Sequence, residues 1–421
     1  MRPLRFCFVT TFYPPYHFGG DAIGIQRFAR GLVARGHHVT VIHDVDAFAT
    51  LAGSVPEVGE GEQDGVDVVP LRSGVGAVSP LLSQQIGRPV VNGRRIQRIL
   101  HDGQFDVVNF HNISLVGGPG VLSYGEGSVR LYMAHEHWLV CPSHVLWRHG
   151  RELCTGRECL RCVMHHRRPP QLWRYTGYLE RQLDQVDAFI AMSEFSRQKH
   201  HDFGFPKEME VLPYFLPDEE PDLHSGTVSP HPRPYFLFVG RLEKIKGLDD
   251  VIPLFRDSPG ADLLVAGDGE YAADLRAQAG GIEHVHFLGR VPVDALRSYY
   301  EHAVALIVPS VCYETFGIIL IEAFRHEIPV LARRLGPFPE IVDQAGGGEL
   351  FATSTELHEG MRRLLEDRGY RNQLAHAGRQ AFEAYWSEDA VMPRYLDIVR
   401  RAAERRGQHE IVAALAPVEV V

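Results

Sequence analysis

The sequence predicts an α/β protein made of two doubly wound, Rossmann-like domains, each built on a parallel sheet. Short, continuous apolar runs rich in β-branched residues alternate with stretches of helical periodicity along nearly the whole chain, which is typical of strands buried on both faces. A proline-rich segment without periodicity interrupts this alternation near the middle of the chain. The chain has 421 residues, well over twice the roughly 150 of a typical domain, so two domains are expected.

The first half begins with a strand–helix–strand unit. Strand-like runs of this half lie at residues 6–10, 39–43, 106–110, 129–135 and 188–193. Between the first two, Ile25, Phe28 and Leu32 recur at helical spacing, and Gly36 ends the predicted helix. We assign residues 1–217 to an N-terminal domain.

The same alternation resumes after the proline-rich segment, which we assign as a linker at residues 218–234. Strand-like runs of the second half lie at residues 235–240, 261–267, 285–289, 304–310 and 328–334. We assign residues 235–385 to a C-terminal domain. Residues 386–421 are predicted to form a closing helix and tail, with Ser387 as N-cap and a break or kink near Pro393.

Composition and charge exclude several classes of protein. The chain is 45% hydrophobic and 23% charged, far from the composition of a disordered chain. Its formal net charge of −10 provides no overall basic field for binding nucleic acid. The first apolar run is too short for a signal peptide, and no later run reaches the roughly 18 apolar residues of a membrane helix. We therefore expect a cytoplasmic protein whose contact with any membrane is peripheral.

Two loops that follow predicted strands suggest a ligand with phosphate groups. Gly19 and Gly20 lie directly before a predicted helix, where the backbone can approach a ligand and N–H groups can meet an anion. A tight turn before a helix is the alternative. Gly240, Arg241 and Lys246 follow the first strand of the second half. Both cations could converge on a pyrophosphate, or they could simply be solvated.

A pair of carboxylates marks the most informative stretch. Glu314 ends the loop after a buried strand, Gly317 opens a helix, and Glu322 lies on that otherwise apolar helix. A carboxylate in apolar surroundings needs a partner, because burying it alone costs several kcal/mol. Exposure of Glu322 to water is the alternative. Two carboxylates and a helix N-terminus suit a ligand with hydroxyls at both ends and phosphate between them.

Together, these motifs resemble glycosyltransferase family 4, a family of retaining enzymes that use nucleotide sugars and have the GT-B fold. The order and spacing of Arg241, Lys246, the loop at 267–271, the run at 285–291 and the Glu314–Glu322 pair carry the resemblance. The first half agrees more loosely, through Gly19-Gly20, His111, His135 and residues 193–197. The resemblance implies two domains that face each other across a cleft, with the acceptor on the N-terminal side and the donor on the C-terminal side.

The resemblance also implies roles for individual residues. Arg241 and Lys246 would bind the diphosphate, Glu322 the ribose hydroxyls and Glu314 the sugar hydroxyls. Backbone groups of Phe316, Gly317 and Ile318 would meet the phosphate, Gly19 and Gly20 would close on it, and Gly240, Gly267, Gly289, Arg290 and Val291 would line the rest of the nucleotide site. His135 would act near the donor sugar, so that His135, Glu314, Arg241 and Lys246 form the expected catalytic set.

Cleavage of a glycosyl–phosphate bond leaves negative charge on the diphosphate, which cations and helix N–H groups stabilise. The single Asp-x-Asp triplet of the sequence, Asp44-Val45-Asp46, lies in the first half, and none occurs in the predicted C-terminal domain. We therefore expect transfer without a catalytic metal, from a UDP- or GDP-linked donor to a hydroxyl acceptor. Two segments depart from the family pattern: Tyr214-Phe215 replaces a frequent Asn-Gly, and residues 336–340 replace a frequent Gly-Gly before Pro-Glu. The base and the sugar therefore stay open.

Four of the six cysteines fall within residues 141–168, which we predict to be a Cys-rich insert. They are Cys141, Cys154, Cys159 and Cys162. In a cytosolic protein, this spacing favours a structural zinc site over disulfides. An iron–sulfur cluster and unliganded thiols are the alternatives. The neighbouring stretch 148–181 carries eight arginines against three glutamates, so an anionic membrane surface or an acidic acceptor could dock there. A solvated rim is the alternative.

Two other functions fit the same motifs. One is a nucleotide-sugar epimerase or hydrolase with the same fold, and the other is a catalytically dead, zinc-clipped scaffold. Turnover of a nucleotide sugar in the absence of an acceptor would distinguish the first from a transferase.

Overall fold

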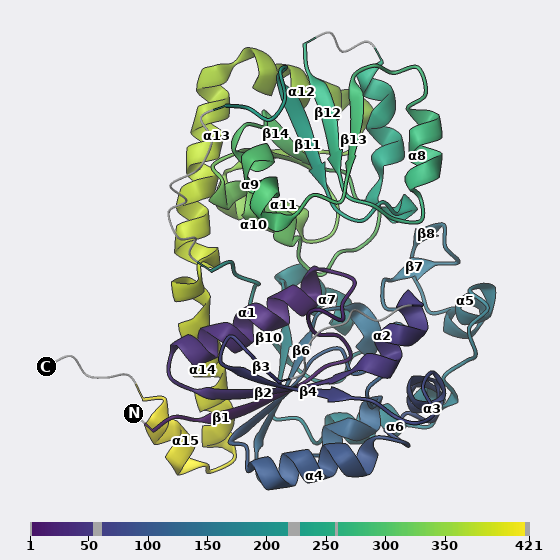
Figure 1. Ribbon diagram of the computed structural model, residues 1–421, viewed down its shortest axis with the longest axis vertical. Coiled ribbons are helices and arrows are strands. Elements are labelled where there is room, and N and C mark those ends of the chain that lie inside the picture. Colours follow the sequence, from purple (N-terminus) through teal and green to yellow (C-terminus); the bar gives the residue numbers. More distant parts are fainter. Residues whose placement is uncertain (1, 54–60, 218–227, 257–259, 417–421) are drawn as a thin grey trace, which may run out of the picture. The chain divides into compact units, whose positions relative to one another are not determined.

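The structure is a computed structural model that describes residues 2–53, 61–217, 228–256 and 260–416 (Figure 1). The chain forms two compact units. The first unit comprises Met1–Tyr214 together with Val391–Val421, and the second comprises Phe215–Ala390. Most of the predicted linker, residues 218–227, lies outside the described residues.

The first unit is built on an eight-stranded sheet with the order β10-β9-β6-β5-β1-β2-β4-β3. All neighbouring pairs are parallel except β3 and β4, which are antiparallel. The strands are β1 (Arg5–Val9), β2 (His38–Asp44), β3 (Gly61–Gln63), β4 (Val66–Leu71), β5 (Val107–Phe110), β6 (Val129–Ala134), β9 (Ala188–Ala191) and β10 (Met209–Val211). The strand order reverses between β1 and β5, the point at which ligands bind in such sheets.

Helices connect these strands, and their apolar faces cover the sheet. The helices are α1 (Gly20–Ala34), α2 (Val45–Ala52), α3 (Val78–Ile86), α4 (Gly93–Gly103), α5 (Cys159–His165), α6 (Tyr178–Leu183) and α7 (Glu194–Asp202). In α1, the three apolar residues singled out by their spacing, Ile25, Phe28 and Leu32, are fully buried. A short hairpin of β7 (Trp147–Arg148) and β8 (Glu152–Leu153) lies within the predicted Cys-rich insert.

The second unit has a six-stranded, fully parallel sheet with the order β13-β12-β11-β14-β15-β16. The strands are β11 (Tyr235–Val239), β12 (Asp262–Ala266), β13 (Val285–Gly289), β14 (Ala305–Val308), β15 (Val330–Arg333) and β16 (Gly348–Phe351). In chain order this is third, second, first, fourth, fifth, sixth, which is the doubly wound Rossmann arrangement. The order reverses between β11 and β14.

Helices of the second unit pack around a core in which Phe236, Leu263 and Ile307 are buried. They are α8 (Ala272–Gln278), α9 (Val293–Glu301), α10 (Ile318–Arg325), α11 (Phe338–Ala345), α12 (Ser354–Glu366) and α13 (Arg368–Ala381). The expected α/β class with two parallel, Rossmann-like sheets is therefore confirmed.

The C-terminal helix α14 (Glu388–Arg405) returns the chain to the first unit, and α15 (His409–Ala414) follows it. Ser387 caps α14, because its hydroxyl accepts a hydrogen bond from the Ala390 N–H at 3.2 Å. The helix is not broken at Pro393, since the proline removes only one hydrogen bond near the helix start.

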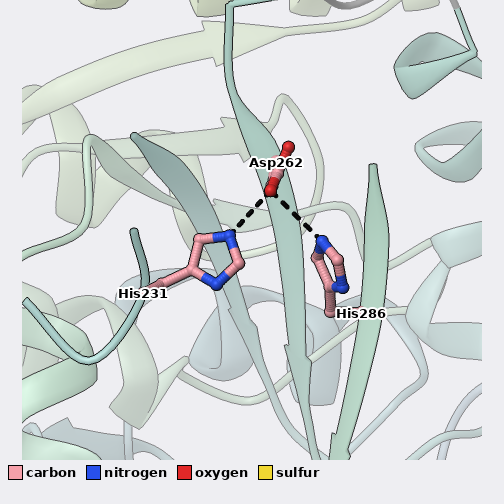
Figure 2. A group of neighbouring side chains, drawn as sticks. All are labelled: His231, Asp262 and His286. Atoms are coloured by element: carbon pink, nitrogen blue, oxygen red, sulfur yellow. Dashed lines mark hydrogen bonds and ion pairs between the residues drawn. The ribbon is translucent and has the colours of Figure 1, made fainter. Parts of the chain in front are cut away.

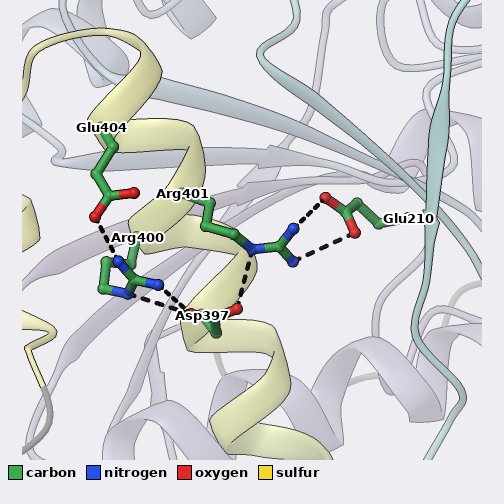
Figure 3. Close-up of polar contacts among 5 residues, drawn as sticks. All are labelled: Glu210, Asp397, Arg400, Arg401 and Glu404. Carbon is green, nitrogen blue, oxygen red and sulfur yellow. Dashed lines mark hydrogen bonds and ion pairs between the residues drawn. The ribbon is translucent and has the colours of Figure 1, made fainter.

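Polar contacts fix α14 to the first sheet (Figure 3). The guanidinium of Arg401 forks onto both carboxylate oxygens of Glu210 in β10, at 2.8 and 3.3 Å. Asp397 accepts further hydrogen bonds from Arg401 and Arg400 at 3.0 and 2.6 Å. The planar fork matches a carboxylate in two bonds, which fixes the orientation of the helix as well as its position. Among the described residues, no helix is long and apolar enough to cross a membrane.

Candidate functional site

In the second unit, the loops that follow β11 and β14 meet where the strand order reverses. Lys246, in the 3₁₀ turn Lys244–Lys246, places its Nζ atom 2.6 Å from Oε1 of Glu314. Gly247 makes this approach possible, because a Cβ atom there would lie 2.1 Å from the carbonyl oxygen of Pro309, and its φ is +74°. The sequence predicted both charged residues as site residues, and the structure brings them together.

Both members of this ion pair are charged at neutral pH. Burial raises the pKa of Glu314, but Lys246 and a hydrogen bond from Ser310 at 3.2 Å more than offset this, so that the pKa is lowered. Burial lowers the pKa of Lys246, whereas Glu314 and then Cys312 raise it, and the net shift is upward. The two side chains keep exposed fractions of 22% and 26%, so a polar ligand can reach the pair.

Helix α10 begins beside this ion pair. Gly317 is its N-cap, with a φ of +129°, and a Cβ atom there would lie 2.9 Å from the ring of Phe338. The first N–H groups of a helix make no bond within the helix, and they carry the positive end of its dipole. Phe316 is buried and Ile318 is half-buried. This arrangement favours an anion at the start of α10.

Glu322 lies one turn further along α10 and is half-buried. Its Oε2 atom accepts a hydrogen bond from the hydroxyl of Tyr300 in α9 at 3.0 Å. Burial, and then the charge of Glu322, hold the pKa of Tyr300 well above its ordinary value, so the phenol remains a donor. The ring of Tyr300 stacks on His326 with centroids 5.2 Å apart. The carboxylate of Glu322 is thus oriented rather than loose.

Arg241 lies in the same loop as Lys246 but does not join the ion pair. Its guanidinium is 2.8 Å from Glu243, and its side chain is 55% exposed. Three further predicted residues, Gly240, Gly267 and Gly289, follow or end the neighbouring strands β11, β12 and β13. The Gly267 N–H donates to the carbonyl of Gly289 at 2.7 Å. Beyond them, Arg290 is exposed and Val291 is half-buried.

The first unit offers a second polar group at its own point of strand reversal. Gly19 is the extended N-cap of α1, and Gly20 is the first residue of that helix. His135 directly follows β6. Its Nε2 atom lies 2.8 Å from Nδ1 of His111, and its Nδ1 atom is hydrogen-bonded to the hydroxyl of Tyr214. Both ring nitrogens of His135 therefore contact neighbouring side chains.

Burial keeps this pair of histidines neutral. Desolvation lowers the pKa of His135 to about 3. It also holds the pKa of His111 well below its usual range, with a further contribution from His135. The Nε2 atom of His111 is buried without a hydrogen-bond partner. The two neutral imidazoles can donate and accept hydrogen bonds, but they do not supply a cation at neutral pH.

Three partners of predicted residues were not identified from the sequence. Ser310 contacts Glu314, Tyr300 contacts Glu322, and Tyr214 contacts His135. Tyr214 was visible only as a departure from the family pattern. The contacts of Tyr300 and Tyr214 join residues 22 and 79 positions apart, so no local spacing pattern could have indicated them. Ser310 lies only four positions before Glu314, and this short spacing was a local signal that the sequence analysis did not use.

The four cysteines of the predicted insert do not form a compact ligand set. Within the described ranges, the side chains that do gather three possible metal-ligand atoms within 4.8 Å are His231, Asp262 and His286. The cysteines are nevertheless near one another, since burial and then Cys141, Cys159 and Cys162 raise the pKa of Cys154. All four are free thiols. Zinc at these cysteines stays a prediction.

Comparisons with known proteins agree with this geometry. Residues 18–220 match the family model described as Glycosyltransferase Family 4, and residues 219–381 match the one described as Glycosyl transferases group 1. A phosphatidyl-myo-inositol mannosyltransferase of Mycobacterium tuberculosis is 32% identical over 400 residues, which cover 89% of this chain and 92% of that protein.

Solved structures show the same fold. A sucrose-phosphate synthase from Thermosynechococcus elongatus has a TM-score of 0.70 at 17% identity, covering 98% of this chain and all of that one. The Anabaena protein Alr3699/HepE in complex with UDP and glucose has a TM-score of 0.64 at 16% identity, covering 94% and 99%. Both identities are low, so these likenesses concern the fold alone.

Proposed function

We propose that this chain, which belongs to glycosyltransferase family 4, transfers a hexose from a nucleotide-diphosphate sugar to a hydroxyl acceptor. The observation that carries the proposal is the Lys246–Glu314 pair at the strand reversal of the second sheet, beside the start of α10. A cation, a helix N-terminus and a carboxylate within one loop cluster suit a sugar diphosphate. The similarity to a mycobacterial mannosyltransferase supports the transfer of a sugar.

In this proposal, each group has a task set by its charge. Lys246 and the N–H groups at the start of α10 face the diphosphate, and Arg241 adds its charge by turning away from Glu243. Glu314 accepts hydrogen bonds from sugar hydroxyls, and Glu322, oriented by Tyr300, accepts them from the ribose. The base packs against the residues that follow β12 and β13. His135 takes part as a neutral group, because its pKa is about 3.

The chemistry follows from where charge develops. As the glycosyl–phosphate bond breaks, the ring becomes positive and the leaving diphosphate becomes more negative. Fixed donors aimed at the leaving group stabilise that state more than the ground state, and each is worth about 10²–10³ in rate. We propose that these protein cations act without a catalytic metal, and that the acceptor attacks on the face of the leaving group, which retains the configuration.

A thermal-shift panel followed by a transfer assay tests the proposal. UDP, GDP, ADP and TDP, each with its sugars, are added to the protein, and the bound nucleotide raises the Tm by mass action. The preferred donor is then incubated with alcohols and polyol lipids, and the anomeric configuration of the product is read by NMR. Product formed only with an acceptor supports a transferase. Turnover without an acceptor supports the epimerase or hydrolase, and no binding to any nucleotide supports the scaffold.

We further propose that the acceptor is met at an anionic membrane surface. Leu81 and Ile86 of α3 are exposed, as are Leu172 and Tyr175 of the 3₁₀ helix Leu172–Tyr175. Trp173 joins these two segments, because its Nε1 atom donates to the carbonyl of Gln84 at 2.9 Å. We call these four exposed side chains the apolar surface. They lie beside the arginine-rich stretch 148–181, and exposed apolar groups next to cations favour a charged lipid interface.

Not all arginines of that stretch can serve this contact. Arg174 stacks over the rings of Trp138 and Trp173, at 5.0 and 4.6 Å from their centroids, and is thus held inside.

Flotation with vesicles that contain anionic lipid tests whether the apolar surface binds a membrane. A Leu172→Ser, Tyr175→Ser double variant should lose vesicle binding. Val293→Ser, at a still more exposed valine of the second unit, should keep it. Equal flotation of both variants would remove the membrane proposal and leave the transferase proposal intact.

The predicted structural zinc at Cys141, Cys154, Cys159 and Cys162 has its support in the spacing and in the mutual effect on the pKa of Cys154. The four sulfurs would have to close up to share one ion. Metal analysis of purified protein and of a Cys159→Ser, Cys162→Ser variant checks this prediction. A zinc content lower by one ion per chain in the variant than in the parent protein would support it.

A further inference from the structure

A buried carboxylate at the opposite edge of the second sheet collects an unusual set of partners. Asp262, the first residue of β12, has only 3% of its side chain exposed. Its Oδ2 atom lies 2.7 Å from Nε2 of His231 and 3.2 Å from Nε2 of His286. Its Oδ1 atom lies 3.0 Å from Nδ1 of His284. Figure 2 shows His231 and His286 pointing at Asp262 from either side.

This cluster is separate from the proposed donor site. His231 precedes β11, Asp262 begins β12, and His286 is the second residue of β13. All three strands are parallel, so the cluster lies where strands begin. Lys246 and Glu314 follow strands that end at the other edge. A five-residue strand separates the two edges by about 16 Å.

The ligand atoms match what a small divalent metal requires. Imidazole nitrogen and carboxylate oxygen are ligands of zinc, with bonds of about 2.0–2.1 Å in tetrahedral sites. Two ligands of such a site are therefore about 3.3 Å apart. The distances from Oδ2 of Asp262 to the ring nitrogens of His231 and His286, 2.7 and 3.2 Å, are about 0.6 and 0.1 Å shorter than this value. An ion could enter after a small outward movement of the imidazoles.

A purely hydrogen-bonding role explains the cluster less well. Arg233 already lies 3.1 Å from Oδ1 of Asp262 and supplies the opposite charge that a buried carboxylate needs. Since Arg233 already balances the charge of the Asp262 carboxylate, three imidazoles around it are more than hydrogen bonding alone requires.

We propose that His231, Asp262 and His286 bind one divalent transition-metal ion of the zinc type, while His284 stays hydrogen-bonded to the other carboxylate oxygen of Asp262. The ion ties the segment before β11 to the beginnings of β12 and β13, and so stabilises the entry into the second unit. It lies at the strand edge away from the donor loops and takes no part in sugar transfer. His284 and His286 are two positions apart, so their side chains share one face of the chain as it enters β13.

Titration of the metal-free full-length protein with Zn²⁺ and Co²⁺ tests this site. A Cys159→Ser, Cys162→Ser background removes two of the four insert cysteines and so disables them as a competing four-thiolate site. In that background we expect one ion per chain, a rise in Tm with Zn²⁺, and a Co²⁺ spectrum with ligand-field bands but no thiolate charge-transfer band. Loss of an outer-shell partner costs roughly 10- to 100-fold in affinity, and His286→Ala or His231→Ala removes a direct ligand and should cost at least as much.

His358→Ala is the matched control, because His358 is an exposed histidine of α12 in the same unit, and it should bind as the parent does. Asp262→Asn provides a second test should a histidine variant fold poorly. No ion bound in the Cys159→Ser, Cys162→Ser background, or equal affinity in the His231, His286 and His358 variants, would overturn the site. Sugar transfer at ordinary temperature should stay unchanged in His231→Ala. A loss of metal without a loss of transfer separates this proposal from the donor site.

Discussion

Replacing Lys246 by Ala tests the proposed donor site most directly. The change removes the cation that lies 2.6 Å from Glu314. It also leaves the Glu314 carboxylate, whose side chain is 26% exposed, facing the donor phosphate without its counter-charge. The variant therefore loses an attraction and gains a repulsion. Loss of one transition-state donor costs about 10²–10³ in kcat, and the added repulsion places Lys246→Ala near the upper end of that range.

Lys244→Ala is the matched control. Lys244 lies in the same 3₁₀ turn, is exposed, and carries the same charge. The variant thus makes the same change in net charge two residues away, and its kcat/KM should stay within about twofold of the parent, because a solvated cation contributes little. Initial rates over a range of donor concentrations separate kcat from KM for both variants.

The Glu314→Gln single variant and the double variant complete the test. Because the two residues act as one unit, the kcat/KM of the double variant should be only slightly lower than that of the less active single variant. Circular dichroism and thermal melts confirm that the variants are folded. A Lys246→Ala enzyme within threefold of the parent, or a Lys244→Ala enzyme that loses as much, would refute the assignment of the diphosphate to this loop.

Three further outcomes follow from the structure. Tyr300→Phe removes the 3.0 Å hydrogen bond that orients Glu322, so the KM for the donor should rise several-fold with kcat nearly unchanged. An unchanged KM would argue against Glu322 as the ribose ligand. Gly247→Ala should lower the free energy of unfolding by about 2 kcal/mol or more, because its Cβ atom would lie 2.1 Å from a backbone carbonyl oxygen. Gly281 has a similar φ of +78° with open space around it, so Gly281→Ala should show only the smaller cost of the backbone conformation. Burial lowers the pKa of His200 from 6.5 to about 4, so the unfolded chain binds a proton below pH 6.5 that the folded chain does not, and stability is lost as the pH falls. At pH 5 this histidine should cost about 2 kcal/mol relative to pH 7.5, and denaturant unfolding of His200→Asn should show a pH dependence smaller by that amount.

The strands were predictable where their apolar runs are continuous. The runs at 235–240 and 261–267 correspond to β11 and β12, because both faces of these strands are buried and the one charged residue, Asp262, stands at the very start of β12. The sequence analysis missed β3, β4, β10 and β16, and the short β7–β8 hairpin. Of these, β3, β10 and β16 are edge strands of three or four residues, whereas β4 is an interior strand whose apolar run is interrupted by Asp67 and Pro70. Short edge strands carry a weak hydrophobic signal.

The candidate site was likewise predictable from the sequence only in part. Lys246 and Glu314 could be found because each follows a strand, and parallel strands bring their ends to one edge. Their meeting across 68 positions could not be read from the sequence. The histidine cluster had one local signal, the His284-x-His286 spacing, but His231 lies in a proline-rich segment and Asp262 begins an apolar run. Only the sheet register brings these residues together.

The two edges of the second sheet are suited to ligands of opposite charge, and the fold itself explains why. A helix that connects two parallel strands runs opposite to them, so helix N-termini gather at the edge where strands end and helix C-termini at the edge where strands begin. The dipoles then favour an anion at the first edge and a cation at the second. Lys246 and the start of α10 lie at the first, and Asp262 with its histidines lies at the second. The side chains thus reinforce a field that the backbone already provides, and this is the physical reason to expect a diphosphate at one edge and a metal ion at the other.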